Sequence, residues 1–206
     1  MADDLPELIV ADAAAWRAWL AEHGREDGVA GLWLVLAKKN VTDPTSLTYD
    51  QALDEALCQG WIDGQVDKRD ERTYRQRWTP RRAKSKWSER NVGLAGRLIA
   101  EGRMRPAGQA EIDRAKADGR WEAAYQGSGS SEVPADLAEA LAGNPAAQAT
   151  FGGLTRTNRY AVLYRIQDAK RPETRARRIA TFVDQLARGE TPYPQKNSGA
   201  AGVAPG

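Results

Sequence analysis

Two alternating stretches within residues 61–80 restrict the fold of this 206-residue chain more than any other feature. Residues 61–66 and 73–78 both have alternating character, and residues 67–72 between them are all charged. Alternation with a period of two is the pattern of a strand whose two faces meet different surroundings. This part of the chain therefore predicts a β-hairpin. The continuous apolar segment within residues 31–39 predicts a further strand, buried on both faces.

Apolar side chains at helical spacing dominate the rest of the chain. Asp12 is a suitable N-cap for a helix over residues 13–22, and Thr48 with Gln51 has the spacing of a capping box. Serines, prolines and glycines at suitable positions bound further helices, which we expect from 85 or 88 to about 100, and at 106–118, 134–142, 145–153, 156–169 and 172–187. The elements together predict an α+β fold, with an antiparallel sheet packed against helices and then a helical C-terminal region.

The segment at 126–132 is rich in Gly and Ser and is the predicted linker. It separates an α+β domain at 1–125, which carries the candidate site, from a helical module at 133–189. Residues 190–206 are rich in Pro, Gly, Ala and Ser and lack a repeating apolar face. We expect this tail to be disordered.

Several classes of protein are excluded by composition. The longest apolar runs are far shorter than the roughly 20 residues that a membrane span needs. The acidic N-terminus lacks the features of a secretory signal, so we expect a cytoplasmic protein. Cys58 is the only cysteine and His23 the only histidine, which rules out an internal disulfide and a Cys/His zinc site. No cofactor and no metal site are predicted, and the oligomeric state is not assigned.

The chain contains a series of motifs, in this order, at 33–34 with 38–39, 49, 56–64, 74–81, 85–91 and 169–179. Together they resemble the YdeI/OmpD-associated family, whose members are sometimes described as bacteriocin-protection proteins. The resemblance covers roughly residues 5 to 195. Its N-terminal part implies a YjbR/CyaY-like fold, and its C-terminal part implies the helical module of the family. The family name implies antimicrobial or stress protection without an established reaction.

The uneven distribution of charge marks a candidate site. The net charge is only +2, yet residues 72–86 hold seven Lys or Arg and no acid. On a strand, Arg75 and Arg77 share one face, and such a guanidinium row can bind a carboxylate or a phosphate. The start of a helix near 85–88 would add free backbone N–H groups. The predicted ligand-binding set is Lys38, Trp61, Asp63, Arg75, Arg77, Trp78, Arg81, Ser85, Trp87 and Asn91.

From these residues and the resemblance we expect a protein that captures a small anionic or aromatic ligand, in a hollow lined by Trp61, Trp78 or Trp87 with Arg77 and Arg81 at its rim. Three alternatives stay open. In a purely structural interpretation, Asp63 pairs with Arg77 or Arg81, and Trp61 and Trp87 lie in the core. Asp63 is also the one candidate general base of an enzyme, although no second base, nucleophile or metal set accompanies it. In the third alternative, nucleic acid binds across this basic set and a second one, Arg156, Arg159, Arg165, Lys170, Arg171, Arg175, Arg177 and Arg178.

Overall fold

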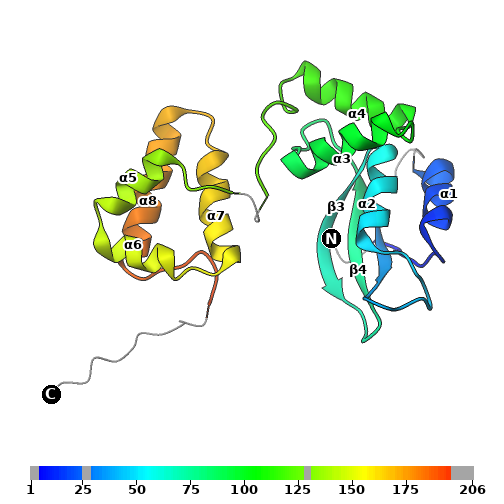
Figure 1. Ribbon diagram of the computed structural model, residues 1–206, viewed down its shortest axis with the longest axis horizontal. Helices are drawn as coiled ribbons and strands as arrows, with labels where there is room; N and C mark the ends of the chain where they lie inside the picture. Colours follow the sequence, from blue (N-terminus) through cyan, green and yellow to red (C-terminus); the bar gives the residue numbers. More distant parts are fainter. Residues whose placement is uncertain (1–4, 25–28, 128–130, 196–206) are drawn as a thin grey trace. The chain divides into compact units, whose positions relative to one another are not determined.

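The computed structural model describes residues 5–24, 29–127 and 131–195. The chain divides into two compact units, Met1–Ala124 and Tyr125–Gly206, and each is described here by itself (Figure 1). The predicted linker at 126–132 includes residues 128–130, which lie outside the described residues.

The first unit contains a four-stranded sheet. Its strands are β1 (Glu7–Leu8), β2 (Leu32–Ala37), β3 (Trp61–Lys68) and β4 (Thr73–Pro80), in the order β1-β2-β4-β3. The predicted hairpin is confirmed, because β3 and β4 pair antiparallel, and β4 also pairs antiparallel with β2. β1 was not predicted and pairs parallel with β2. The predicted α+β class is therefore confirmed, with a short parallel strand added at one edge.

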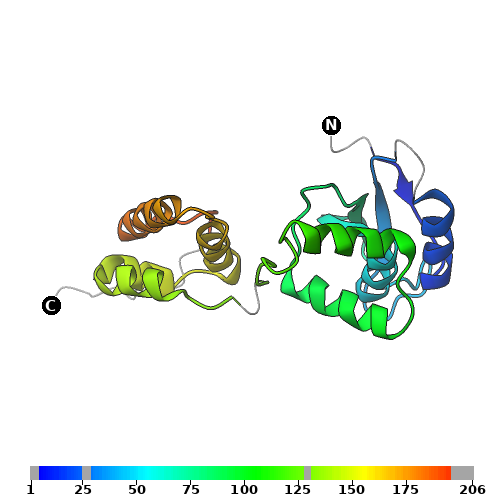
Figure 2. The ribbon, with the colours of Figure 1, turned by 90° about the horizontal axis from the view of Figure 1, so that it is seen from above.

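Helices cover one face of this sheet, on the side where Leu34 of β2 lies opposite Gln76 of β4. The helices are α1 (Ala13–His23), α2 (Tyr49–Cys58), α3 (Glu89–Ala100) and α4 (Pro106–Ala117), and α1, α3 and α4 each pack against α2 (Figure 2). Because α2 is surrounded in this way, six of its ten residues are buried. The core of the unit lies between these helices and the covered face of the sheet.

The ends of these helices follow the predicted caps. The Asp12 carboxylate accepts a hydrogen bond from the Ala15 N–H, and Thr48 and Gln51 form the complete capping box. The Ser88 hydroxyl accepts from the N–H of Asn91 at the start of α3, which decides between the two serines proposed as its cap. Each cap satisfies an N–H group that the first turn of a helix leaves without an internal partner.

The second unit is helical, as predicted. It consists of α5 (Ala135–Ala142), α6 (Pro145–Gly152), α7 (Arg156–Gln167) and α8 (Pro172–Ala187), and α8 contacts each of the other three. Its separate core is formed by ten buried residues, among them Leu137, Phe151 and Phe182.

The prediction of a disordered tail from residue 190 is wrong for its first residues. The Asn158 carboxamide donates to the Tyr193 carbonyl oxygen and accepts from the Tyr193 N–H, at 3.0 and 2.8 Å. The Gln195 carboxamide bonds to Asn158 as well. A buried asparagine on α7 therefore anchors the chain as far as residue 195, and the rest of the predicted tail lies outside the described residues. Among the helices of the described residues, none is long and apolar enough to cross a membrane.

Candidate anion-binding site

The side chains of Arg75 and Arg77 project from one face of the sheet, as the alternation predicted, and the structure shows that this face is the one opposite the helices. Arg75 is held by its own hairpin: its Nε and Nη2 donate to the Asp67 carboxylate at 3.0 and 2.7 Å, and its guanidinium lies 4.9 Å from the centre of the Trp33 ring. Its Nη1 also lies 3.7 Å from Glu7. Because two carboxylates and an aromatic ring already contact the Arg75 guanidinium, its charge is compensated within the protein and is not available to a ligand.

Arg77 lies in a different setting, beside a β-bulge. The pairing of β3 and β4 shifts between Asp63 and Val66, so that β3 carries one extra residue opposite Arg77. A bulge bends its strand and often occurs next to a functional site. Here it accompanies a small pocket of about 170 Å³ at the end of the hairpin, lined by Gly64, Arg77, Thr79, Pro80, Arg82 and Ser85.

Groups that donate hydrogen bonds dominate this pocket, and its lining contains no carboxylate. The Nε atom of Arg77 is buried and has no hydrogen-bond partner. Within the described residues, neither Arg77 nor Arg82 forms an ion pair. The Ser85 hydroxyl oxygen accepts from the Arg82 N–H at 2.9 Å, which leaves its own hydrogen free to donate. Two positive charges and at least one hydroxyl donor therefore face one small volume without a negative partner.

Arg81 does not line this pocket and has a structural role. Its guanidinium carbon lies 3.6 Å from the centre of the Trp87 ring, its Nη1 donates to the Lys86 carbonyl oxygen at 3.1 Å, and only 6% of the residue is exposed. Arg120, which follows the C-terminus of α4, donates from Nη1 to the Ser85 carbonyl oxygen at 2.6 Å. These contacts fix the loop after β4, and with it the position of Ser85 and Arg82. The predicted rim position of Arg81 is therefore wrong.

The tryptophans of the predicted site lie in the core and line no hollow. Trp61 and Trp78 are fully buried and Trp87 is 2% exposed. Trp61 packs edge-on against Trp16, and its indole N–H donates to the Gly24 carbonyl oxygen. This correction follows from the register, because Trp78 lies on the helix-covered face of β4 and Arg77 on the other. The structural interpretation was right about Trp61 and Trp87.

The Asp63 carboxylate is also on the covered face, so it pairs with neither Arg77 nor Arg81, contrary to the structural interpretation. It accepts from the Tyr49 hydroxyl at 3.0 Å and from the Gln76 amide at 3.3 Å. Burial, together with this neighbouring carboxylate, raises the pKa of Tyr49 to about 12. Asp63 thus links β3 to α2 by a hydrogen bond, and it does not line the pocket.

Lys38 and Asn91 complete the predicted set, and the structure brings neither to the pocket. The Lys38 ammonium donates to the Asp70 carbonyl oxygen, beside the turn at the opposite end of β4. Asn91 is buried in the first turn of α3, whose N-terminus does not line the pocket. Of the ten predicted residues, only Arg77 and Ser85 line it. Gly64, Thr79, Pro80 and Arg82 were missed, although Thr79 shares the alternating face of Arg77.

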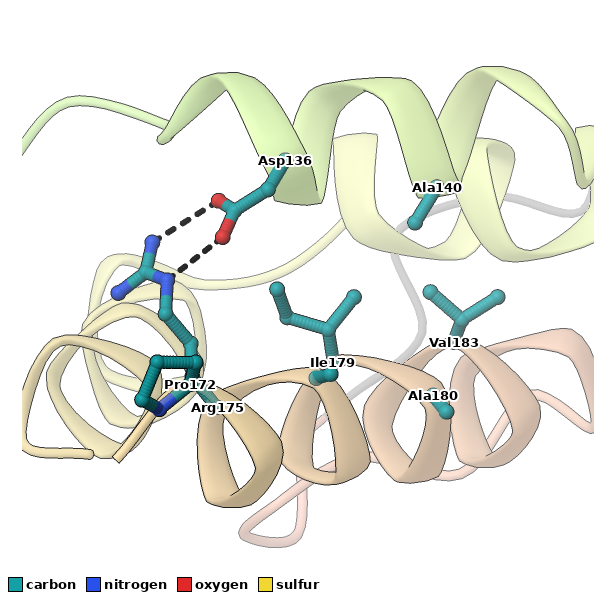
Figure 3. A pocket seen from close by; sticks show the side chains of 8 residues that line it. Asp136, Ala140, Pro172, Arg175, Ile179, Ala180 and Val183 are labelled. Carbon is teal, nitrogen blue, oxygen red and sulfur yellow. Dashed lines mark hydrogen bonds and ion pairs between the residues drawn. The ribbon is translucent and has the colours of Figure 1, made fainter. Parts of the chain in front are cut away.

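The basic side chains of the second unit are partly occupied by contacts within it. Figure 3 shows the Arg175 guanidinium paired with both oxygens of Asp136, at 2.6 and 2.8 Å, at one end of an apolar groove between α5 and α8. Arg175 also donates to the Ile166 carbonyl oxygen, and Arg178 donates to that of Arg165. Arg159 lies over the Phe151 ring. Arg175 and Arg178 thus satisfy carbonyl oxygens in the last turn of α7, and Arg159 covers a core ring. These positive charges are therefore engaged in contacts within the unit.

Comparison with known proteins gives two matches along the chain. Residues 8–111, just over half of it, match a family described as a domain of unknown function (DUF8412). Residues 130–189 match a family described as Bacteriocin-protection, YdeI or OmpD-Associated, which supports the resemblance for the second unit. Nothing in the matches connects the first unit to the YjbR/CyaY-like superfamily. No match was found among curated proteins or among solved structures.

Proposed function

The chain belongs to the family described as a domain of unknown function (DUF8412), and we propose that it is a binding protein whose first unit captures a small anion beside Arg77. The observation that carries the proposal is the pair of guanidinium groups, Arg77 and Arg82, facing one pocket whose lining holds no carboxylate. A role in antimicrobial or stress protection is part of the proposal, and the bound anion would be a captured or sensed compound. The bacteriocin-protection family that residues 130–189 match supports the antimicrobial part.

Desolvation of Arg77 is the physical reason to expect an anion. A buried donor without a partner costs about 1–3 kcal/mol, and more when the group is charged. Arg75 on the same face of β4, and Arg69 in the turn of the hairpin, are each paired with carboxylates. The Nε atom of Arg77 is buried without such compensation. A carboxylate or a phosphate would supply it, because both match the planar donor fork of a guanidinium.

The size of the pocket restricts the ligand. A volume of about 170 Å³ corresponds to roughly five or six water molecules, which suits one carboxylate or one tetrahedral oxyanion. The remainder of a larger ligand would extend into solvent. The aromatic ligand has no support from the geometry, because Trp61, Trp78 and Trp87 are in the core.

Binding can be tested by isothermal titration of the full chain with phosphate and with acetate, at constant low ionic strength. Arg77→Ala removes a charged donor and should weaken binding about 10- to 100-fold, from the 1.5–3 kcal/mol of a hydrogen bond to a charged group. Arg72→Ala is the matched control, since Arg72 is an exposed arginine of the same basic segment that pairs with Asp43 away from the pocket. Equal binding by both variants, or no binding of either anion, would refute the proposal.

The two other functions have weaker support. An enzyme that used Asp63 would need that carboxylate in a pocket, and it lies outside the one beside Arg77. Nucleic-acid binding would draw on the second basic set, where Arg159, Arg175 and Arg178 already make contacts within the unit. Arg165 and Arg177 line a separate cleft between α7 and α8. A salt-dependent gel shift of DNA that is lost in Arg177→Ala would favour this alternative.

A further inference from the structure

We infer that the anion captured beside Arg77 is a phosphoryl group in its doubly charged form, so that the protein recognises free phosphate or the phosphate end of a small monoester. The inference rests on the proposed function and narrows it. Its basis is the match between the charge and donors of the pocket and those of a phosphate dianion.

Charge favours a dianion over a carboxylate. Arg77 and Arg82 bring two positive charges that have no carboxylate partner in the described part of the chain. A carboxylate carries one negative charge and would leave one guanidinium uncompensated, whereas a phosphate monoester carries about −1.5 to −2 at pH 7. At the same distances, a doubly charged ligand is attracted to each of the two guanidinium groups twice as strongly as a singly charged one.

The donors favour an oxyanion with three or more acceptor oxygens. The buried Arg77 Nε and the free hydroxyl hydrogen of Ser85 lie on different elements, β4 and the loop that follows it. The exposed Arg82 comes from that loop too, and Thr79 brings a second hydroxyl. A planar carboxylate presents two oxygens in one plane, whereas a tetrahedral group can accept from donors that approach from several directions.

The pocket itself has no group that titrates near neutral pH. Its lining consists of arginine, serine, threonine, glycine and proline. Among the charged groups around it, Arg120 holds the Ser85 carbonyl oxygen, and Asp118 is paired with Arg120 and has a pKa below its usual value. Asp63 lies on the other face of the sheet, bound to Tyr49. Any pH dependence of binding between pH 5 and 7.5 must therefore come from the ligand.

Titration calorimetry of the full chain at pH 5.0 and pH 7.5 tests this, with methyl phosphate, inorganic phosphate, sulfate and acetate as probes. The second pKa of a phosphate monoester is about 6, so only about a tenth of it is dianionic at pH 5. Methyl phosphate should therefore bind about tenfold more tightly at pH 7.5, while sulfate, which stays doubly charged, should bind equally at both pH values. Acetate should bind at least tenfold more weakly than methyl phosphate at pH 7.5.

A variant of Arg82 tests the charge argument separately. Arg82→Ala leaves one guanidinium in the pocket, so the preference for methyl phosphate over acetate should fall about tenfold, whereas Arg72→Ala should keep it. If acetate and methyl phosphate bind alike, with no pH dependence, the inference is wrong although anion capture stands. If no probe binds, the proposed function itself fails. Binding of inorganic phosphate without methyl phosphate would identify the free anion as the ligand.

Discussion

The buried carboxylate of Glu55 should stabilise the first unit, and replacing it by the isosteric amide measures by how much. Glu55 lies on α2 with 5% of its side chain exposed. It accepts from the Nε and Nη2 atoms of Arg17 at 2.8 and 2.7 Å, and from Arg103 Nη2 at 2.9 Å. Three charge-assisted hydrogen bonds therefore join α1 and the loop after α3 to the central helix.

Removing one partner of a fully buried pair costs about 3–5 kcal/mol. The cost should be lower here, because half of the Arg17 side chain and a third of that of Arg103 are exposed and water can hydrate them. We therefore expect Glu55→Gln to lower the free energy of unfolding by about 2 kcal/mol. The control, Glu101→Gln, removes a carboxylate that bonds to arginines on the surface, and it should change the stability much less.

Urea unfolding followed by tryptophan fluorescence is the suitable assay. All seven tryptophans lie between residues 16 and 121, so the signal reports the first unit alone. A loss within about 0.5 kcal/mol of that of Glu101→Gln would refute the reasoning, because the buried network would then contribute no more than an exposed ion pair.

Three further changes test other parts of the structure. Arg81→Ala should lower the stability of the first unit by about 2 kcal/mol, since the guanidinium lies desolvated over Trp87, and a thermal midpoint equal to that of wild type would contradict this. Tyr49 should stay protonated in the folded protein up to about pH 12, so its contribution to stability is complete below pH 10 and is lost as the pH rises through 12. In absorbance titration at alkaline pH, Tyr49→Phe should lack one late-titrating tyrosine, and an unchanged late step would refute the assignment. Asp63→Asn should change the affinity for phosphate by less than about twofold, because the carboxylate lies on the opposite sheet face. A tenfold loss of affinity would show that Asp63 contributes to the binding site.

Most elements could be predicted because local signals determine them. Asp12 and Ser88 cap their helices through bonds to residues three positions away, and the alternation of β4 places Arg77 and Trp78 on opposite faces. β1 was missed because a two-residue strand has no periodicity to detect. The tail was misassigned because its anchor, Asn158, lies 35 residues away from Tyr193.

The candidate site could be predicted only in part, for a similar reason. Alternation already separates Trp78 from Arg77, so one hollow could not hold both side chains, and the predicted set was inconsistent at this point. Which of the two faces the helices cover is decided by packing, and it puts Trp78 in the core. The direction of Arg81 is decided by the Trp87 ring, and the bulge beside Gly64 is decided by the pairing of β3 with β4. Such tertiary contacts leave no pattern in a single sequence.

The central claim is that the buried Nε–H of Arg77 binds an anion, and NMR can observe that group directly. The ¹H–¹⁵N correlation of arginine Nε groups, with the Arg77 signal assigned by its loss in Arg77→Lys, should be followed during titration with phosphate. The account predicts a saturable shift of the Arg77 Nε–H signal, while that of Arg72 stays in place. An Arg77 signal that does not move, at phosphate concentrations where other signals of the chain do, would contradict it.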